Sequence, residues 1–182
     1  MVLLESLQLP MGSDIIDFSL PGTDDKTYSP SNFADKKAVV IIFMCNHCPY
    51  VQAILNRLIR LQFHYADKGV QLIGINSNES KNFPDDSFEN MKKIAEKKEI
   101  NFVYLHDESQ EVAKVYQAQC TPDIYVFDQG RKLAYHGRLD DNWQEEDAVE
   151  KRELRTALDA ILESQPVPEP QYPSMGCSIK WR

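Results

Sequence analysis

Apolar and polar positions follow one another along the chain in blocks that predict alternating strands and helices. Residues 38–44 form a continuous apolar run rich in valine and isoleucine, which is typical of a buried strand. Residues 46–66 carry apolar side chains at helical spacing, and residues 70–75 form a second strand-like run. The pattern therefore predicts a strand, an amphipathic helix and another strand in direct succession.

The same alternation continues to residue 163 and closes with a hairpin, because Asp128-Gln129-Gly130-Arg131 between two short apolar runs has the composition of a turn. Such an order predicts an α/β fold, a central mixed sheet with helices on both faces. Further strands are expected at 102–105, 124–127 and 133–136, and further helices near 87–98 (capped by Asp85, Asp86 or Ser87), at 109–117 and at 147–163.

Two segments flank this core and complete the predicted organisation. Residues 1–37 read as an N-terminal β extension with a turn at 21–25, and they belong to a single domain that spans residues 1–165. Residues 166–182 form a proline-rich C-terminal tail, which begins in polyproline-like conformation and ends with Cys177 and Trp181. We expect this tail to pack on the domain, with Ile179 and Trp181 as apolar anchors.

Composition and charge argue against nucleic-acid-binding and membrane proteins. The chain has 182 residues, 42% of them hydrophobic, and a formal net charge of −8. An acidic chain is poorly suited to binding nucleic acid or an anionic membrane, so neither is expected as a partner. No apolar run approaches the roughly 18–20 residues that span a bilayer, and the N-terminus lacks the features of a signal peptide. We therefore expect a cytoplasmic protein.

The candidate chemistry lies in Cys45-Asn46-His47-Cys48, directly after the first buried strand and before the predicted helix. Two cysteines separated by two residues can close a disulfide, and a strand–CxxC–helix context is typical of redox sites. A cysteine at a helix N-terminus faces unpaired N–H groups and the positive end of the helix dipole, which favour its thiolate. We therefore expect Cys45 to have a lowered pKa and to be the nucleophile.

At this point the chain resembles the thioredoxin superfamily, through Cys45-Asn46-His47-Cys48 and through Thr121-Pro122 before the hairpin. More narrowly it resembles an AhpC/TSA- and TlpA-related, peroxiredoxin-like group. This resemblance rests on Cys45 to Tyr50, on Gly74 to Asn78, on Cys120-Thr121-Pro122-Asp123, and on the tail Gly176-Cys177-Ser178-Ile179-Lys180-Trp181. It implies a thioredoxin-like fold and a cis Thr121–Pro122 peptide beside the cysteine pair, with the Thr121 backbone exposed to pair with a substrate strand.

The sequence departs from these families at three positions. Peroxiredoxins carry a proline and a threonine before their peroxide-reducing cysteine, where this chain has Ala38 and Ile42. Thioredoxin carries a buried acid in the strand before its motif, where this chain has Val39. The resemblance therefore implies disulfide chemistry more strongly than peroxidase chemistry, and it leaves the proton acceptor unidentified.

Three further residues are candidates for roles around the pair. His47 is expected to donate to the Cys45 sulfur or to place positive charge near it, which resembles strongly oxidising members of the superfamily. Cys120 and Cys177 are possible auxiliary thiols, although Cys120 also fits a small buried core residue. A tail folded over the domain is expected to bring Cys177 toward another thiol, with Cys120 as the first candidate.

The sequence thus predicts a thiol-disulfide oxidoreductase with Cys45, Cys48, His47, Thr121 and Pro122 in its site and no cofactor. Its partners would be a disulfide-bearing substrate and a thiol reductant. Three alternatives remain open: a copper-chaperone-like metal site formed by Cys45, Cys48 and a histidine such as His136, an atypical thiol peroxidase, and a binding module that uses the Thr121-Pro122 edge without turnover.

Overall fold

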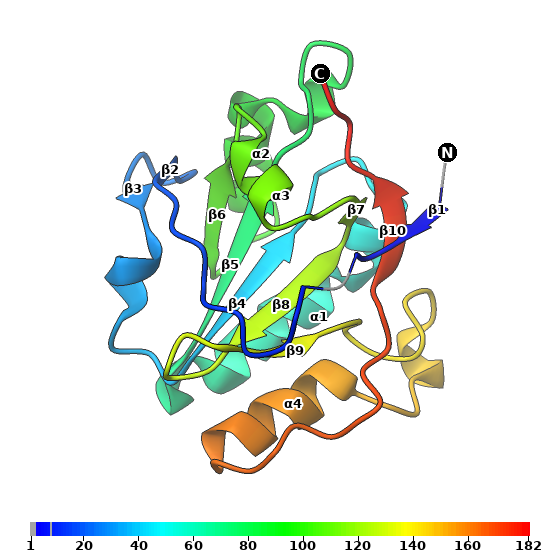
Figure 1. Cartoon of the computed structure of the whole chain (residues 1–182). Helices are drawn as coiled ribbons and strands as arrows, with labels where there is room; N and C mark the ends of the chain where they lie inside the picture. Colours follow the sequence, from blue (N-terminus) through cyan, green and yellow to red (C-terminus); the bar gives the residue numbers. More distant parts are fainter. Residues whose placement is uncertain (1–2, 8) are drawn as a thin grey trace.

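The computed structural model describes residues 3–7 and 9–182 and is built on a five-stranded central sheet (Figure 1). The strands lie in the order β6-β5-β4-β8-β9. β6, β5 and β4 are parallel to one another, β8 is antiparallel to β4, and β9 is antiparallel to β8. The predicted mixed sheet is therefore confirmed. The strand bounds are β4 (Ala38–Phe43), β5 (Val70–Asn76), β6 (Val103–His106), β8 (Asp123–Phe127) and β9 (Leu133–His136).

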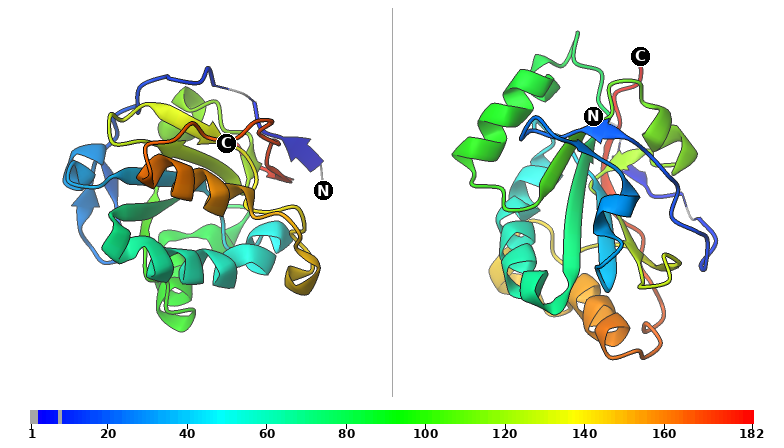
Figure 2. Two further views of the ribbon diagram at one scale, coloured as in Figure 1. Left: turned by 90° about the horizontal axis from the view of Figure 1, so that it is seen from below. Right: turned by 90° about the vertical axis from the view of Figure 1, so that its left-hand side faces the viewer.

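Helices cover both faces of this sheet, as the sequence predicts (Figure 2). They are α1 (Pro49–Tyr65), α2 (Phe88–Lys97), α3 (Glu111–Val115) and α4 (Glu153–Leu162). α1, α2 and α4 contribute side chains to one buried cluster, whereas α3 packs with the N-terminal segment in a second cluster. The two clusters lie on opposite faces of β4, because side chains alternate along a strand.

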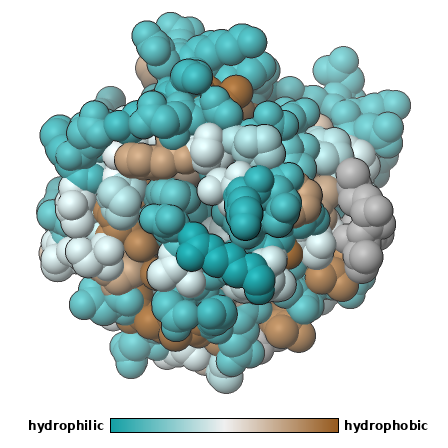
Figure 3. Space-filling model, turned by 90° about the horizontal axis from the view of Figure 1, so that it is seen from above, coloured by the Kyte–Doolittle hydropathy of each residue, from teal (hydrophilic) through white to brown (hydrophobic). Residues whose placement is uncertain are grey.

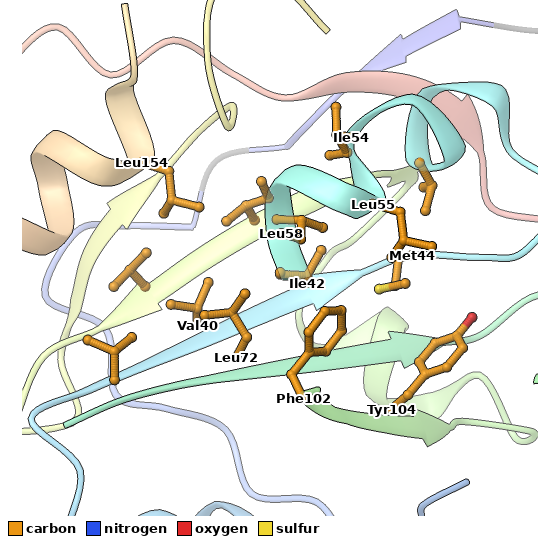
Figure 4. Close-up of a cluster of buried hydrophobic side chains, with 14 of the residues drawn as sticks. Val40, Ile42, Met44, Ile54, Leu55, Leu58, Leu72, Phe102, Tyr104 and Leu154 are labelled. Carbon is orange, nitrogen blue, oxygen red and sulfur yellow. The ribbon is translucent and has the colours of Figure 1, made fainter. Parts of the chain in front are cut away.

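The apolar run of β4 is continuous because both of its faces are buried. Val40 and Ile42 belong to the cluster that contains Leu58 of α1 (Figure 4). Val39 and Ile41 belong to the other cluster. A central strand covered on both sides has no polar face, which explains why the sequence shows no alternation here.

Two predicted helices begin later than the sequence pattern suggests. The helix expected at 46–66 starts at Pro49, with Cys48 as its N-cap residue. Proline suits the first helical position because it has no N–H to leave unpaired. The helix expected at 147–163 starts at Glu153, since residues 146–148 form a separate 3₁₀ turn. The other predicted elements agree with the structure to within two residues at each end, and the strand at 133–136 matches it in full.

The N-terminal extension and the tail meet in a second small sheet. β1 (Leu3–Glu5), β10 (Met175–Ser178) and β7 (Cys120–Thr121) lie in the order β1-β10-β7, and both pairings are antiparallel. Around the predicted turn at 21–25, β2 (Leu20–Pro21) pairs with β3 (Thr27–Tyr28). The tail is therefore a structural strand rather than an appended coil, and it lies directly beside Thr121-Pro122.

The tail is anchored by one of the two residues expected to do so. The side chain of Ile179 is 3% exposed and belongs to the second buried cluster, whereas Trp181 is 42% exposed. The upper face of the molecule is mostly hydrophilic with small apolar patches (Figure 3). Within the part of the chain that the structure describes, no helix has the length and apolar character needed to cross a membrane.

Candidate active site

The cysteine motif spans the loop between β4 and α1. Cys45 follows the end of β4 and lies in the loop, while Cys48 caps α1. The expectation that Cys45 lies at the helix N-terminus is therefore wrong, because Pro49 fixes the helix start three residues later than predicted. Both cysteines are buried, with 1% and 0% of their surface exposed.

Thr121 contacts both sulfurs. The Cys45 Sγ lies 3.4 Å from the Thr121 hydroxyl, and the Cys48 Sγ lies 3.1 Å from the Thr121 carbonyl oxygen, to which it donates when it carries a proton. The Thr121–Pro122 peptide is cis, as the resemblance implies. Thr121 and the cysteine pair thus form one constellation, in which β7 and the β4–α1 loop hold the sulfurs between them.

The pKa of Cys45 is raised by its surroundings, whereas the sequence predicted a lowered pKa. A hydrogen bond from the Cys45 thiol lowers the pKa of Cys48 to about 5, and donors from Cys177 and the Val51 backbone lower it further against the effect of burial. The pKa of Cys45 is raised, first by that shared hydrogen bond, then by burial and by the negative charge of Asp86. Of the two thiols, Cys48 at the N-cap of α1 is thus the one whose pKa is lowered.

Asp86 is the functional residue that the sequence did not reveal. It ends a 3₁₀ turn, Pro84–Asp86, and its side chain is fully buried beside the motif instead of capping α2, where Ser87 is the N-cap. The Asp86 carboxylate accepts a hydrogen bond of 2.6 Å from the Asn46 backbone N–H and pairs with His47 Nδ1 at 2.5 Å. His47 lies near the Cys45 sulfur, as predicted, but its hydrogen bond is to the buried acid.

Asp86 is a buried acid beside the motif, which the strand before the motif, β4, does not provide. Position 39 is a valine in the core, so the buried carboxylate comes from the segment that precedes α2. The Cys45 sulfur, a ring nitrogen of His47 and a carboxylate oxygen of Asp86 all lie within 4.8 Å of one another. The His47 ring is also stacked on Phe83, with ring centroids 5.4 Å apart. The arrangement fixes a negative charge and an imidazole beside the Cys45 sulfur.

The three groups offer a thiol, an imidazole and a carboxylate to a metal ion, but the Asp86 carboxylate is already saturated. Its Oδ1 accepts from the Asn46 backbone and the Asn76 amide, and its Oδ2 accepts from the Asn78 amide and faces His47. A carboxylate has about four acceptor positions. The carboxylate therefore fits a hydrogen-bond hub better than a metal ligand.

The histidine proposed as a distant metal ligand lies elsewhere. His136 Nε2 pairs with Asp123 at 2.8 Å, and Asp123 also accepts from the hydroxyls of Ser6 and Tyr125. This buried network joins β8 and β9, and His136 Nε2 is paired with Asp123. The metal site of Cys45, Cys48 and His136 that the sequence left open is thus not assembled.

The two auxiliary thiols point in different directions. Cys177 is directly opposite Thr121 in the β10–β7 pair, and Ser178 is opposite Cys120. Side chains of directly opposed residues share a face, and those of successive residues alternate. Cys177 therefore faces the redox pair, where its thiol hydrogen-bonds to Cys48. The expectation that Cys120 is its first partner is wrong.

Cys120 fits the role of a buried core residue. Its side chain is fully buried, and its sulfur lies 3.9 Å from the Ser6 hydroxyl and 3.7 Å from the Pro122 carbonyl oxygen. Burial and the neighbouring charge of Asp123 raise its pKa. A thiol held in its protonated form by burial is a poor nucleophile.

The Cys45 sulfur, unlike that of Cys48, belongs to a residue that lines a cavity beside the motif. A cavity of ≈ 270 Å³ beside α1 is lined by Cys45, by Val51 and Leu55 of α1, and by Ile94 and Lys98 at α2. Cys48 is not part of its wall. A substrate in this cavity would therefore meet Cys45, while Cys48 stays behind it.

Comparisons with known proteins agree with this architecture. A model of the AhpC/TSA family matches residues 11–136. An uncharacterized conserved protein from Geobacillus kaustophilus has 45% sequence identity and a TM-score of 0.95, covering 100% of this chain and 97% of its own. A hypothetical protein from Sinorhizobium meliloti has 36% identity and a TM-score of 0.93, covering 98% of each chain. A comparison with curated proteins gives no match.

A more distant likeness identifies the fold. The thioredoxin domain of a thiol-disulfide oxidoreductase from Bacteroides vulgatus has a TM-score of 0.61 at 19% identity, covering 71% of this chain and 89% of its own. At this level of identity the likeness concerns the fold alone, which is thioredoxin-like, as the sequence predicts.

Proposed function

The protein belongs to the AhpC/TSA family of thioredoxin-like oxidoreductases, and we propose that within it the chain is a thiol-disulfide oxidoreductase whose redox pair is Cys45 and Cys48. One observation carries this proposal: both sulfurs lie against Thr121, beside the cis Thr121–Pro122 peptide. Such a pair holds its nucleophile and its resolving group in one preformed site.

The cavity favours Cys45 as the sulfur that attacks the substrate. Cys45 lines the cavity, whereas Cys48 is screened by Thr121 and the tail strand. The Cys45 proton passes along the shared hydrogen bond to the Cys48 thiolate, which acts as general base. The Cys45 sulfur then bonds to one substrate sulfur, and the substrate disulfide breaks and releases one thiolate.

Resolution follows within the pair. Cys48 gives its proton to the released thiolate and attacks the Cys45 sulfur of the mixed disulfide. The Cys45–Cys48 bond forms, and the second substrate sulfur leaves as a thiolate. The substrate gains two electrons and the pair loses two, so a thiol reductant must recharge the enzyme. We propose that the chain works in this reductase direction in the cytoplasm.

Reduction of peroxide is less well supported. Ala38 and Ile42 stand where peroxiredoxins carry their proline and threonine, and both are fully buried apolar residues of β4. Neither offers a hydroxyl to a bound peroxide. Disulfide exchange needs no such group, because the substrate sulfur is itself the electrophile.

The test is reduction of insulin by dithiothreitol with catalytic amounts of the full chain. We expect wild-type protein to accelerate the reaction and Cys45→Ser to abolish the acceleration, because the attacking sulfur is lost. Cys48→Ser should attack more slowly and then accumulate mixed disulfides that can be isolated by mass.

Cys120→Ser is the matched control, since Cys120 is equally buried but faces away from the pair. It should retain wild-type turnover. Equal rates for wild type and Cys45→Ser would overturn the proposed function.

A further inference from the structure

The C-terminal strand lies where the family resemblance places a substrate. Thr121 was expected to offer its backbone to a substrate strand, but in this structure β10 pairs with it, and Cys177 lies directly opposite. The Cys177 thiol hydrogen-bonds to Cys48, whose own sulfur lies 3.1 Å from the Thr121 carbonyl oxygen. The chain thus presents one of its own cysteines to the redox pair on a paired strand.

The close fit of this strand is visible at Gly176. A Cβ at position 176 would lie 2.0 Å from the Thr121 carbonyl oxygen, far inside the contact distance of any two atoms. Only glycine lets β10 approach Thr121 closely enough to bring the next residue, Cys177, to Cys48. The tail strand is therefore matched to the site by its backbone and not only by its thiol.

From this geometry we propose that Cys177 is a third redox residue, which forms a disulfide with Cys48 by exchange with the Cys45–Cys48 bond. The inference rests on the proposed function, because that bond must form first. Cys177 attacks the Cys48 sulfur, the Cys48–Cys177 bond forms, and Cys45 leaves as a thiolate that takes up the proton Cys177 has lost. The exchange consumes no oxidant or reductant.

The charges on the three sulfurs agree with this order of events. In the reduced protein, burial and the charged Cys48 sulfur raise the pKa of Cys177 to about 12, so Cys177 is a thiol. Once Cys48 is bound in the disulfide with Cys45, that charge is gone and Cys177 loses its proton more easily. Oxidation of the pair thus activates Cys177.

The exchange has a consequence for turnover. It returns Cys45 to a thiol at the cavity while the oxidised bond moves to α1 and the tail strand.

The test is disulfide mapping of the full chain. Cleavage after lysine and arginine gives fragment 38–57 with Cys45 and Cys48, fragment 115–131 with Cys120, and fragment 156–180 with Cys177. Reduced protein is oxidised with diamide, quenched with acid, blocked with N-ethylmaleimide and analysed by mass. We expect both an internal disulfide in 38–57 and a link between 38–57 and 156–180.

Variants assign the link to its sulfurs. Cys48→Ser and Cys177→Ser should lose the link, and Cys120→Ser should leave it unchanged. Cys45→Ser should form the link more slowly than wild type, because exchange is then impossible and diamide must oxidise Cys48 and Cys177 directly. Gly176→Val should reduce the link with all four thiols retained, because β10 must move away from Thr121. Its matched control is Met175→Val, at the exposed neighbouring position of the strand.

The experiment distinguishes failure of the Cys177 inference from failure of the proposed function. An internal disulfide in 38–57 without any link to 156–180 in wild type would overturn this inference and leave the proposed function standing. Absence of the internal disulfide itself would overturn both.

Discussion

At the scale of single residues, the hydrogen bonds around the two sulfurs decide which of them carries the charge. The sequence places a cysteine pair between a strand and a helix, but the helix could begin at any of several positions. Because it begins at Pro49, the helix dipole and the Val51 backbone act on Cys48 and not on Cys45. The position of the thiolate depends on this shift of three residues, which periodicity alone does not resolve.

Asp86 offers a direct test at this scale. Its negative charge is one cause of the raised pKa of Cys45, after the bond to Cys48 and burial. In a Cys48→Ser background, where only Cys45 is alkylated in fragment 38–57, Asp86→Asn should shift the midpoint of alkylation against pH to lower pH. Removing a nearby negative charge favours the thiolate, which fixes the sign. The rate of alkylation by iodoacetamide, followed by mass, gives the profile.

Asp85→Asn is the matched control, because Asp85 is the exposed neighbour of Asp86 and its amide should leave the midpoint in place. An unchanged or higher midpoint in Asp86→Asn would show that Asp86 does not act on Cys45.

At the scale of elements, the strands and helices of the core follow from the apolar pattern, whereas the two small sheets at the ends of the chain do not. β7, β1 and β10 span two to four residues each, too short for any periodicity to show. β10 is stabilised by pairing with residues far away in the sequence and by the burial of Ile179. Composition indicated an extended tail but not its partner strands.

The docking of the tail can be measured at this scale. Ile179→Ala should lower the free energy of unfolding by about 2–5 kcal/mol, because the side chain is buried in the second core cluster. Trp181→Ala should change it by less than about 0.5 kcal/mol, since Trp181 is half exposed. Urea unfolding of the reduced proteins compares the two. Equal effects would show that the tail is not anchored by Ile179.

At the scale of the whole molecule, the site is assembled from segments that are remote in the sequence. The motif, Asp86, Thr121 and Cys177 come from four different segments of the chain. The thioredoxin-like pattern in the sequence identified the motif and Thr121. The sequence also pointed to Cys177, but with Cys120 as its partner instead of Cys48. Asp86 was missed because a surface-like run of acidic residues before a helix resembles a helix cap.

The redox equilibrium of the pair with glutathione tests the central claim most directly. Full-length protein is equilibrated with mixtures of reduced and oxidised glutathione, and the internal disulfide of fragment 38–57 is quantified by mass. Because the Cys48 thiolate is stabilised, the disulfide should be reduced more readily than that of thioredoxin, with a two-electron potential above about −270 mV. The equilibrium should be lost in Cys45→Ser and in Cys48→Ser. A pair that stays reduced across all mixtures, or that oxidises without reversing, would contradict the account.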